Sequence, residues 1–560
     1  MKKSRKVIAL LLALIISVSA FGAVVSAEDD APYNRYVSVV PGSPSPKGTS
    51  SKPWGIDYLK EDAFAQAIND KIQSGSYTSV VINIMSSEDY DAPLIIKGVE
   101  GTKDVPVYVV GNYLAGGEGN DSVITPAGGA EYGIAVEDCS YVNISNLKIC
   151  NANMGGALGG GINVINSNNI TFQNISSYKP NQNYKKTMTN AVTIGDGVSN
   201  IVFEGCSFTH TEKAFEIVKS EEPEAKGITG LTISNCSSEY CASQALLISG
   251  INDVAINNFS AVRAFYVEEE EDQGVETGKE YIDEPAVVLD NIEGLTFSDA
   301  EILECPGPAL SLRNVKSAVV EKVFSENNAA FMVNTLANDC NIVIRYCISA
   351  NDNGKTSVAS LTNAGGVCFI NNTIYNIGEF DFGKLSSSVI KNNIFQTVMF
   401  GKINVGSNDC SNNCYWNTSK PSGDSKSMMK NPQFFDTVTS TPSKGEFVLA
   451  DNSVLIAAGT KVDGFMGTED IFDNEITGKE SFNIGAYQGA GVTPVVEIDQ
   501  TREIIQYYFS YFTEKIKQAF DNFLSLFLTP EQKQSISDWF TNTFSGIISK
   551  IAEIIGSFTG

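Results

Sequence analysis

A phrase of alternating apolar and polar residues recurs along the middle of the chain. Its first clear copy, YVNISNLKI, begins at Tyr141 and places an asparagine two residues after an apolar Ile144. Alternation with a period of two is typical of β-strands, because successive side chains point to opposite faces. Ten further copies follow, and the positions equivalent to Ile144 are Phe172, Phe203, Ile233, Ile256, Phe297, Val320, Ile344, Ile370, Lys391 and Ser411.

Consecutive copies lie 20 to 41 residues apart. Repeats of this length in constant phase predict a solenoid, because one short strand cannot bury its apolar face alone whereas stacked coils can. An asparagine column, suited to left-handed turns, holds Asn146, Asn174, Asn235, Asn258, Asn372, Asn393 and Asn413, with Asp299 as a near match. The next column, predicted to point inward, holds Leu147, Ile175, Cys206, Cys236, Phe259, Ala300, Val323, Cys347 and Cys414.

Each coil carries a second strand in which Ala or Gly is followed by apolar, variable and apolar residues. The first copy is Gly161-Ile162-Asn163-Val164, and the last that we align begins at Ala330. The pattern predicts an all-β right-handed parallel β-helix with coils stacked about 4.8 Å apart. The outward row of this second strand reads Asn163, Thr193, Glu216, Leu247, Val288, Ser311 and Met332, and the row two residues further reads Ile165, Gly195, Val218, Ser249, Asp290, Arg313 and Asn334.

The two ends of the chain have different patterns. Residues 59–73 are helix-like, and we expect this amphipathic helix to cap the open end of the solenoid. The β-helix domain is predicted over residues 28–489, followed by a linker at 490–500. Apolar residues recur at helical spacing in 501–560, which indicates two helices. They form either a hairpin packed on itself or on the solenoid, or an amphipathic anchor to another protein or to a membrane surface.

The N-terminus predicts secretion. Four cations, Lys2, Lys3, Arg5 and Lys6, precede an apolar run, and Val25-Ser26-Ala27 fits a cleavage site, so residues 1–27 form a signal peptide. Cleavage removes four cations and no anions, which changes the formal net charge from -26 to -30. Such an acidic protein is not expected to bind nucleic acid.

Cysteine is abundant but lacks a motif. The chain has 11 cysteines and no C-x-x-C. Because several cysteines share the predicted inward column, we favour buried, reduced thiols over a disulfide framework.

Several segments carry a resemblance to a known family. SPKGTSSKPWG, from Ser45, and IIKGVEGTKDVPVYVVG, from Ile95, resemble the beginning of secreted right-handed parallel β-helix proteins that include pectate lyases. NPQFF, from Asn431, and NIGAYQG, from Asn483, resemble their final segment. The layout is similar to that of polysaccharide lyase family 9. The resemblance implies a monomeric protein that acts on polysaccharide outside the cell, and the C-terminal helices offer a means of attachment at the cell surface.

Calcium-assisted β-elimination is the chemistry that this resemblance implies. The family holds calcium on an Asp-Asp-Gly-aromatic-Asp type of rung and takes the proton with a lysine on a later rung. On this chain EKAFE occupies the acidic rung, so Glu216 matches the last carboxylate and Glu212 the first, while Lys213 stands where a second carboxylate is expected. Neither outward row offers a lysine, and Lys219 is the nearest candidate.

Other candidate residues come from the outward rows and from turns. Asp290 and Arg313 are expected to be neighbours on adjacent rungs, as a surface salt bridge or as a catalytic pair. Glu216, with Asp196 of a Gly-Asp-Gly turn and Asp290, is the candidate set for calcium. The single histidine, His210, lacks the Gly-His-Gly setting of polygalacturonases and is expected to be an incidental turn residue. The acidic insertion Glu268 to Glu284 is either a solvated loop or a calcium site.

Three functions therefore stay open. The first is a calcium-assisted polysaccharide lyase, which lacks the expected base and carboxylates. The second is a non-catalytic β-helix that binds glycan or serves as a surface adhesin, and apolar outward residues such as Leu247 and Val288 favour it. The third is a structural surface protein held by its C-terminal helices.

Overall fold

The computed structural model describes residues 31–39, 46–85, 89–113, 122–125, 130–150, 160–177, 188–220, 227–265, 284–336, 339–352, 354–358, 364–383, 385–398, 405, 408–424 and 426–494. These residues fall into two compact units. The first comprises residues up to 432 with 440–444 and 454–489, and the second comprises 433–439, 445–453 and the described residues from 490 onward. The predicted signal peptide, the linker from 495, the C-terminal helices and nearly all of the acidic insertion lie outside the described residues.

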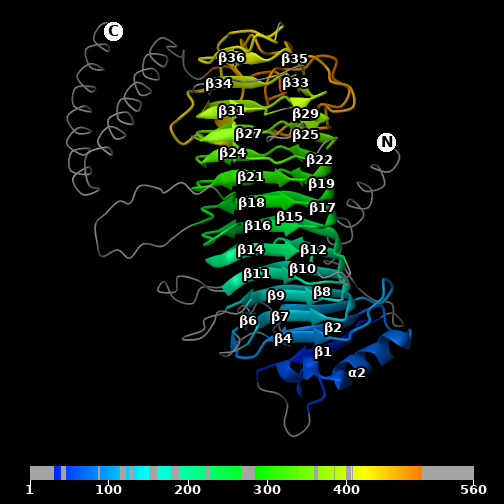
Figure 1. Ribbon diagram of the computed structural model, residues 1–560. Coiled ribbons are helices and arrows are strands. Elements are labelled where there is room, and N and C mark those ends of the chain that lie inside the picture. Colours follow the sequence, from blue (N-terminus) through cyan, green and yellow to red (C-terminus); the bar gives the residue numbers. More distant parts are fainter. Residues whose placement is uncertain are drawn as a thin grey trace, which may run out of the picture. The chain divides into compact units, whose positions relative to one another are not determined.

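The first unit is a long parallel β-helix (Figure 1). Strands of consecutive coils pair in parallel and in register, as β8 does with β10, and β14 with β16. Its largest sheet has 23 strands: β1 (Tyr33–Val37), β2 (Val80–Met85), β3 (Asp89–Tyr90), β5 (Val107–Tyr113), β6 (Ser122–Ile124), β8 (Ser140–Ile149), β10 (Asn168–Ser177), β12 (Ser199–Glu204), β13 (Ser207–Thr209), β15 (Thr229–Glu239), β17 (Asn252–Val262), β19 (Glu293–Ser298), β20 (Glu301–Leu303), β22 (Lys316–Glu321), β23 (Phe324–Glu326), β25 (Ile342–Arg345), β26 (Ile348–Ala350), β29 (Val367–Ile370), β30 (Thr373–Ile377), β33 (Val389–Lys391), β34 (Ile394–Val398), β35 (Asp409–Ser411) and β36 (Cys414–Trp416).

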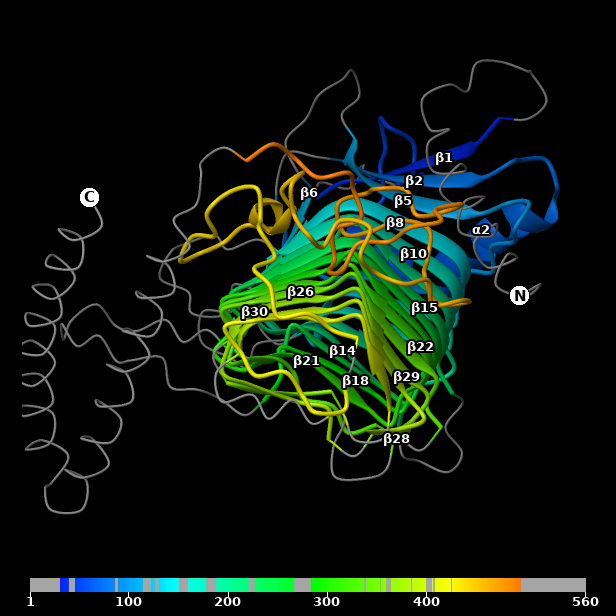
Figure 2. The same cartoon turned by 90° about the horizontal axis from the view of Figure 1, so that it is seen from above.

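A second sheet has nine strands and forms another side of the coils from β4 to β24. It consists of β4 (Leu94–Lys97), β7 (Tyr132–Glu137), β9 (Gly160–Ile165), β11 (Met188–Ile194), β14 (Thr211–Val218), β16 (Leu246–Ser249), β18 (Val287–Asp290), β21 (Pro308–Arg313) and β24 (Ala330–Met332). Two short sheets pair β27 (Lys355–Ser357) with β31 (Glu379–Asp381), and β28 (Ala364–Gly365) with β32 (Leu385–Ser386). Seen from above, successive strands lie over one another and enclose the core (Figure 2). The predicted parallel β-helix is therefore confirmed.

Asparagines turn the chain at the corners of the coils. Asn146, Asn174, Asn235 and Asn258 have φ between 52° and 57°, in the left-handed region that asparagine tolerates. The long strands β8, β10, β15 and β17 run through these positions. The side chains of these asparagines also stack along the coil axis, since Asn174 Nδ2 donates to Asn146 Oδ1 at 3.1 Å. The predicted asparagine column is confirmed in these coils.

The predicted alignment of the repeat, and with it the asparagine column, is wrong by one residue in the last three coils. Ile344 pairs with Phe369 and not with Ile370, and the same shift continues to Ile390 and Cys410. The left-handed corner is therefore occupied by Asn371, Asn392 and Asn412. Asn372, Asn393 and Asn413 point inward. Cys414, which was predicted for this inward column, lies one position further along and pairs with Ile394.

These three inward asparagines form a ladder inside the core, and each is fully buried. Asn372 donates from its backbone N and from Nδ2 to Asn393 Oδ1, at 2.9 and 3.1 Å. Asn393 repeats both bonds to Asn413 Oδ1. At the end of the ladder Asn413 Nδ2 donates to Asp424 Oδ2 at 2.9 Å. Amides can thus replace apolar side chains in this column because each amide oxygen accepts hydrogen bonds from buried donors of the preceding coil.

Aromatic side chains fill the core of the middle coils. Phe172 and Phe203 stack with ring centroids 5.1 Å apart, and Phe215 meets Phe203 edge-on at 5.3 Å. All 11 cysteines are free and buried, which confirms that they act as small apolar side chains. Burial raises the pKa of the Cys139 thiol to about 11 and that of Cys347 to about 12.

Thiol reactivity checks this packing. We expect the native protein at pH 8 to react with an aromatic disulfide reagent at fewer than one thiol in the first minutes, because the reactive thiolate is scarce and shielded. The denatured protein should show all 11 thiols. A fast native reaction of two or more thiols would contradict the buried, reduced assignment.

The N-terminal helix forms where it was predicted. The short η2 (Ile56–Lys60) precedes α2 (Asp62–Gln73), whose Phe64, Ala65, Ile68 and Ile72 are buried. Asn69 on α2 accepts from the backbone N of Glu100 and donates to Gly98 O, both at 2.9 Å. These bonds fix the helix to the first coils, and its role as a cap stays a prediction. No helix among the described residues is both long and apolar enough to cross a bilayer.

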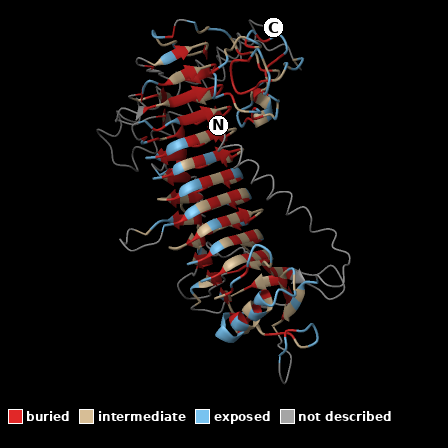
Figure 3. Ribbon diagram, turned by 90° about the vertical axis from the view of Figure 1, so that its right-hand side faces the viewer, coloured by how far each residue is buried: buried red, intermediate tan, exposed pale blue. Residues whose placement is uncertain are grey.

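The end of the first unit covers the outer face of the last coils. Val462, Met466, Ile476 and Phe482 pack against outward-pointing residues that include Val343 and Cys368. Tyr346 OH donates to Met466 O at 2.8 Å. Figure 3 shows the result, since strands of the middle coils expose some positions whereas those of the last coils are buried almost throughout.

The second unit is small and held by aromatic packing. Phe434 bridges to Leu449 in antiparallel fashion, and its ring meets that of Phe447 edge-on at 5.4 Å. Ala450 bridges to Val492 in parallel. The helix η3 (Lys444–Phe447) includes Phe447 at its end.

Candidate functional site

The outward row of the nine-stranded sheet is the predicted location of the site. The register aligns Asn163, Thr193, Glu216 and Leu247 on consecutive coils, as predicted. The row continues through Val288 and Ser311, which are only 2% and 1% exposed. At the other end of the row Asn163 on β9 is 7% exposed, so the row is accessible mainly at β11 to β16.

Two residues predicted to end the outward rows lie in the core instead. Met332 pairs with Leu310 and is fully buried. Asn334 is also buried, and its Oδ1 accepts from Leu312 N at 3.0 Å. The neighbour of Arg313 is Thr335 rather than Asn334. The cause is a shift of one residue in β24, which exchanges its inward and outward positions.

A polar cluster lies where β14 stacks on β11. Glu216 accepts hydrogen bonds from Asn190 Nδ2 through one carboxylate oxygen and from Lys213 Nζ through the other. Ala214 and Phe215 are both buried, so the in-and-out alternation of β14 breaks between Lys213 and Glu216 and lets them meet. The side chains of Lys213 and Glu216 are 20% and 28% exposed. The cluster presents amide, ammonium and carboxylate groups in a fixed arrangement at a partly exposed surface.

Sequence reasoning identified Glu216 but not its partners. Lys219, the predicted cation, is exposed beyond the end of β14, and Lys213 takes the contact with Glu216 instead. Glu212 is half-buried on the same strand, and its backbone carbonyl accepts from Ser243 N at 2.8 Å. Asn190 lies on the preceding coil, directly beside Lys213. Aligning the second strands of these two coils would have placed Asn190 next to Lys213 and so close to Glu216.

The proposed calcium ligands lie on separate elements of the fold. Asp290 is two strands from Glu216, with β16 between them, and it accepts from Ser249 Oγ at 3.1 Å. It is the rung neighbour of Arg313, as predicted, while Arg313 Nε donates to Ser311 Oγ at 3.3 Å. Asp196 lies in the turn after β11. In the part of the chain that the structure describes, no three His, Cys, Asp or Glu side chains are grouped to hold a metal ion.

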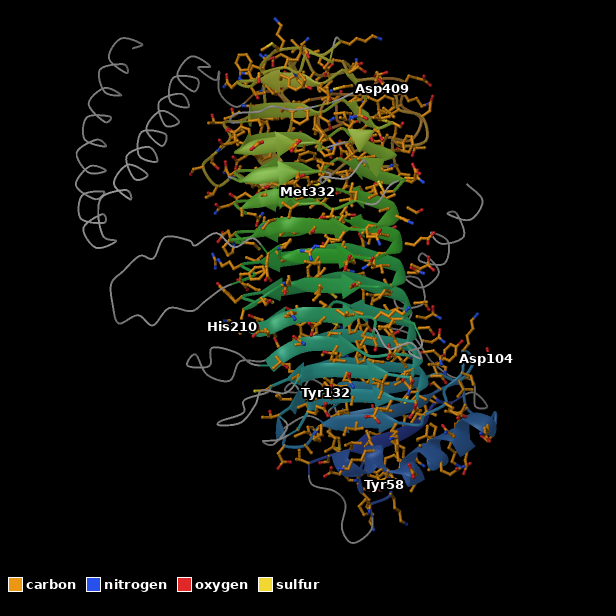
Figure 4. The ribbon with its side chains drawn as sticks, in the orientation of Figure 1. Tyr58, Asp104, Tyr132, His210, Met332 and Asp409 are labelled. Atoms are coloured by element: carbon orange, nitrogen blue, oxygen red, sulfur yellow. The ribbon has the colours of Figure 1, made fainter. Side chains whose placement is uncertain are left out.

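His210 occupies a corner column next to the same strand. Figure 4 labels its position. Its φ is 55°, and its ring lies 5.0 Å from that of Tyr240 on the next coil. Tyr240 OH accepts from Arg263 Nη1 at 2.5 Å, and Arg263 Nε donates to Glu304 at 2.8 Å. The histidine thus belongs to a ladder of side chains that links four coils.

Comparisons with known proteins give similarity in structure only. No protein-family model matches the chain, and no curated protein matches it by sequence. A lacto-N-biosidase of family GH136 from Eubacterium ramulus is 13% identical, with a TM-score of 0.41, over 70% of this chain and 67% of that one. Pectate lyase Pel9A is 16% identical, with a TM-score of 0.37, over 83% and 97%. A family PL6 polysaccharide lyase from Pseudopedobacter saltans is 11% identical, with a TM-score of 0.42, over 68% and 96%. In its strand pairing, the chain has a parallel β-helix fold.

Proposed function

We propose that the protein binds polysaccharide along the outward face of the nine-stranded sheet, with Asn190, Lys213 and Glu216 as the central contact. The observation that carries the proposal is that both carboxylate oxygens of Glu216 are hydrogen-bonded at a partly exposed surface. Sugar hydroxyls both donate and accept, and a site that fixes acceptors beside donors recognises them. Because the three groups hold one another, little conformational entropy is lost on binding.

The row around this cluster supports a linear ligand. The partly exposed Thr193 and Glu216 stack on consecutive coils, about 4.8 Å apart, and the buried Asn163 lies one coil before them. Polar groups therefore repeat along the coil axis as the units of a sugar chain repeat along their own. The proposal includes secretion, which the N-terminus predicts, a monomeric state, and attachment at the cell surface through the C-terminal helices.

Substitutions in the cluster test the binding site. Glu216→Gln and Lys213→Met should each weaken binding to the recognised polysaccharide by about tenfold or more, because each leaves a partner group unpaired. Lys391→Met is the matched control, since it removes a similar lysine–carboxylate contact, to Asp409 at 2.6 Å, from the other large sheet. Affinity electrophoresis against a panel of neutral and acidic polysaccharides gives the measurement. Equal retention of all three variants would place the binding site elsewhere.

A calcium-assisted lyase is the second candidate, and the position of Lys213 favours it. Lys213 lies beside the polar row, and once it has released the proton that it donates to Glu216 it could take a carbon-bound proton as the adjacent carbon–oxygen bond breaks and a double bond forms. The three proposed ligands Glu216, Asp196 and Asp290 do not converge, so we assign no step to calcium. Ultraviolet absorbance of the double bond, with calcium and with chelator, separates the two candidates. A calcium-dependent signal that Glu216→Gln abolishes would replace the binding proposal.

A further inference from the structure

Aromatic rings gather where the first strand meets the N-terminal helix. Tyr33 on β1 lies 5.1 Å from Tyr77, and the buried Trp54 lies 5.1 Å from Tyr58. Tyr33, Tyr58 and Tyr77 are half-buried, and Tyr58 is at the end of the unit (Figure 4). This group is on β1 and the segments around α2, and none of its residues belongs to the cluster at Glu216.

Two cations face the same ring. The guanidinium carbon of Arg35 is 3.6 Å from the centroid of Tyr33, and Lys71 Nζ is 5.5 Å from it. Among the described residues neither cation forms an ion pair, whereas other lysines such as Lys60 and Lys97 contact carboxylates. Two cations without carboxylate partners on one ring stand out in a chain of net charge -26.

Arg35 also has an unsatisfied donor. Its Nη1 donates to Asn34 O at 2.7 Å, but its Nε is buried and has no hydrogen-bond partner. The Cδ of Arg35 lies close to Gly48, and its guanidinium carbon is 5.9 Å from the centroid of the Trp54 ring. A buried donor without an acceptor costs stability, and an anionic oxygen on this edge of the guanidinium would supply the acceptor.

We propose that Tyr33, Arg35, Lys71 and Tyr77 form a binding site for an acidic sugar. The anionic group, a carboxylate or a phosphate, contacts Arg35 and Lys71, and the sugar ring packs against the tyrosines. Tyrosine suits this role because its ring offers a flat apolar surface at low entropic cost. Cation–ring contacts already hold both charges in place before the ligand arrives.

Calorimetric titration of the full chain tests the site with four probes. We expect glucuronate and glucose 6-phosphate to bind at least about tenfold more tightly than glucose, and the tighter of the two identifies the anionic group. Inorganic phosphate tests the contribution of the rings. If glucose binds as tightly as glucuronate and glucose 6-phosphate, the cations do not recognise the ligand. If inorganic phosphate binds as tightly as glucose 6-phosphate, the tyrosine rings do not contribute.

Variants locate the site on the chain. Arg35→Gln and Lys71→Gln should each weaken binding of the acidic sugar by about tenfold, and Lys103→Gln, an exposed cation in a turn, should not. Lys71 lies on the partly exposed side of α2, so Lys71→Gln should fold normally. It therefore tests the site even if Arg35→Gln fails to fold. Unchanged affinity in Lys71→Gln would overturn the proposal.

Discussion

Replacing Asn393 with alanine is expected to lower the free energy of unfolding by about 3 kcal/mol or more. Asn393 Oδ1 accepts from both the backbone N and Nδ2 of Asn372, and its Nδ2 donates to Phe369 O at 3.0 Å. Alanine leaves these groups buried and unpaired in a column where every asparagine is fully buried. Urea denaturation followed by circular dichroism measures the loss.

Asn235→Ala is the matched control for a structural asparagine outside the core. Asn235 occupies the left-handed corner at φ 52° and is exposed, so its amide groups regain water when the contact is lost. The substitution should cost about 1–2 kcal/mol through backbone strain. If Asn393→Ala costs no more than Asn235→Ala, the inward ladder does not stabilise the core as the structure indicates.

The repeat could be predicted from the sequence because each coil has to bury the same face. The period of two and the asparagine corners identify the strands β8, β10, β15 and β17 without further information. The register failed where asparagine is doubled, at Asn371-Asn372, Asn392-Asn393 and Asn412-Asn413. Either residue of such a pair can occupy the corner, and only the packing of the coil decides. An inward asparagine also contradicts the expectation that a core column is apolar, and its hydrogen bonds to the next coil resolve the contradiction.

The site was less predictable because it depends on departures from the repeat. Strict alternation places Lys213 and Glu216 on opposite faces of β14, and they meet only because Ala214 and Phe215 are both buried. A similar irregularity moves Met332 and Asn334 into the core. Contacts between coils, such as that of Asn190 with Glu216, link residues 26 positions apart. A sequence pattern shows which residues share a row but does not show which of their side chains bond.

A second buried polar column contains an ionisable group. Asp352 is fully buried and accepts from Ser325 Oγ, Ser349 Oγ and Asn328 N, at 2.7, 2.6 and 3.0 Å. No cation contacts it among the described residues. Burial raises the pKa of Asp352 from 3.8 to about 6, although the hydrogen bonds oppose the shift. The carboxylate therefore costs stability at neutral pH.

Asp352→Asn is expected to stabilise the protein increasingly as the pH rises. Below about pH 4 the carboxyl is protonated in the folded and unfolded states, so it costs little. Between pH 4 and 6 the unfolded chain ionises first, and wild-type stability falls by roughly 3 kcal/mol, since each pKa unit is worth about 1.4 kcal/mol. Asparagine does not titrate, so the advantage of the variant should grow by this amount and stay constant above pH 6.

The neighbouring coil shows that asparagine fits this column. Asn328 Oδ1 accepts from Cys305 N at 2.9 Å, and its Nδ2 donates to Ser325 Oγ at 3.0 Å. The amide that Asp352→Asn introduces can form the same bonds one coil further on. Melting temperatures of wild type and variant from pH 3.5 to 8 measure the difference, with Asp104→Asn at an exposed turn as the control. A difference that does not change with pH would show that Asp352 carries no excess cost when ionised, and a difference that falls with pH would reverse the sign of its pKa shift.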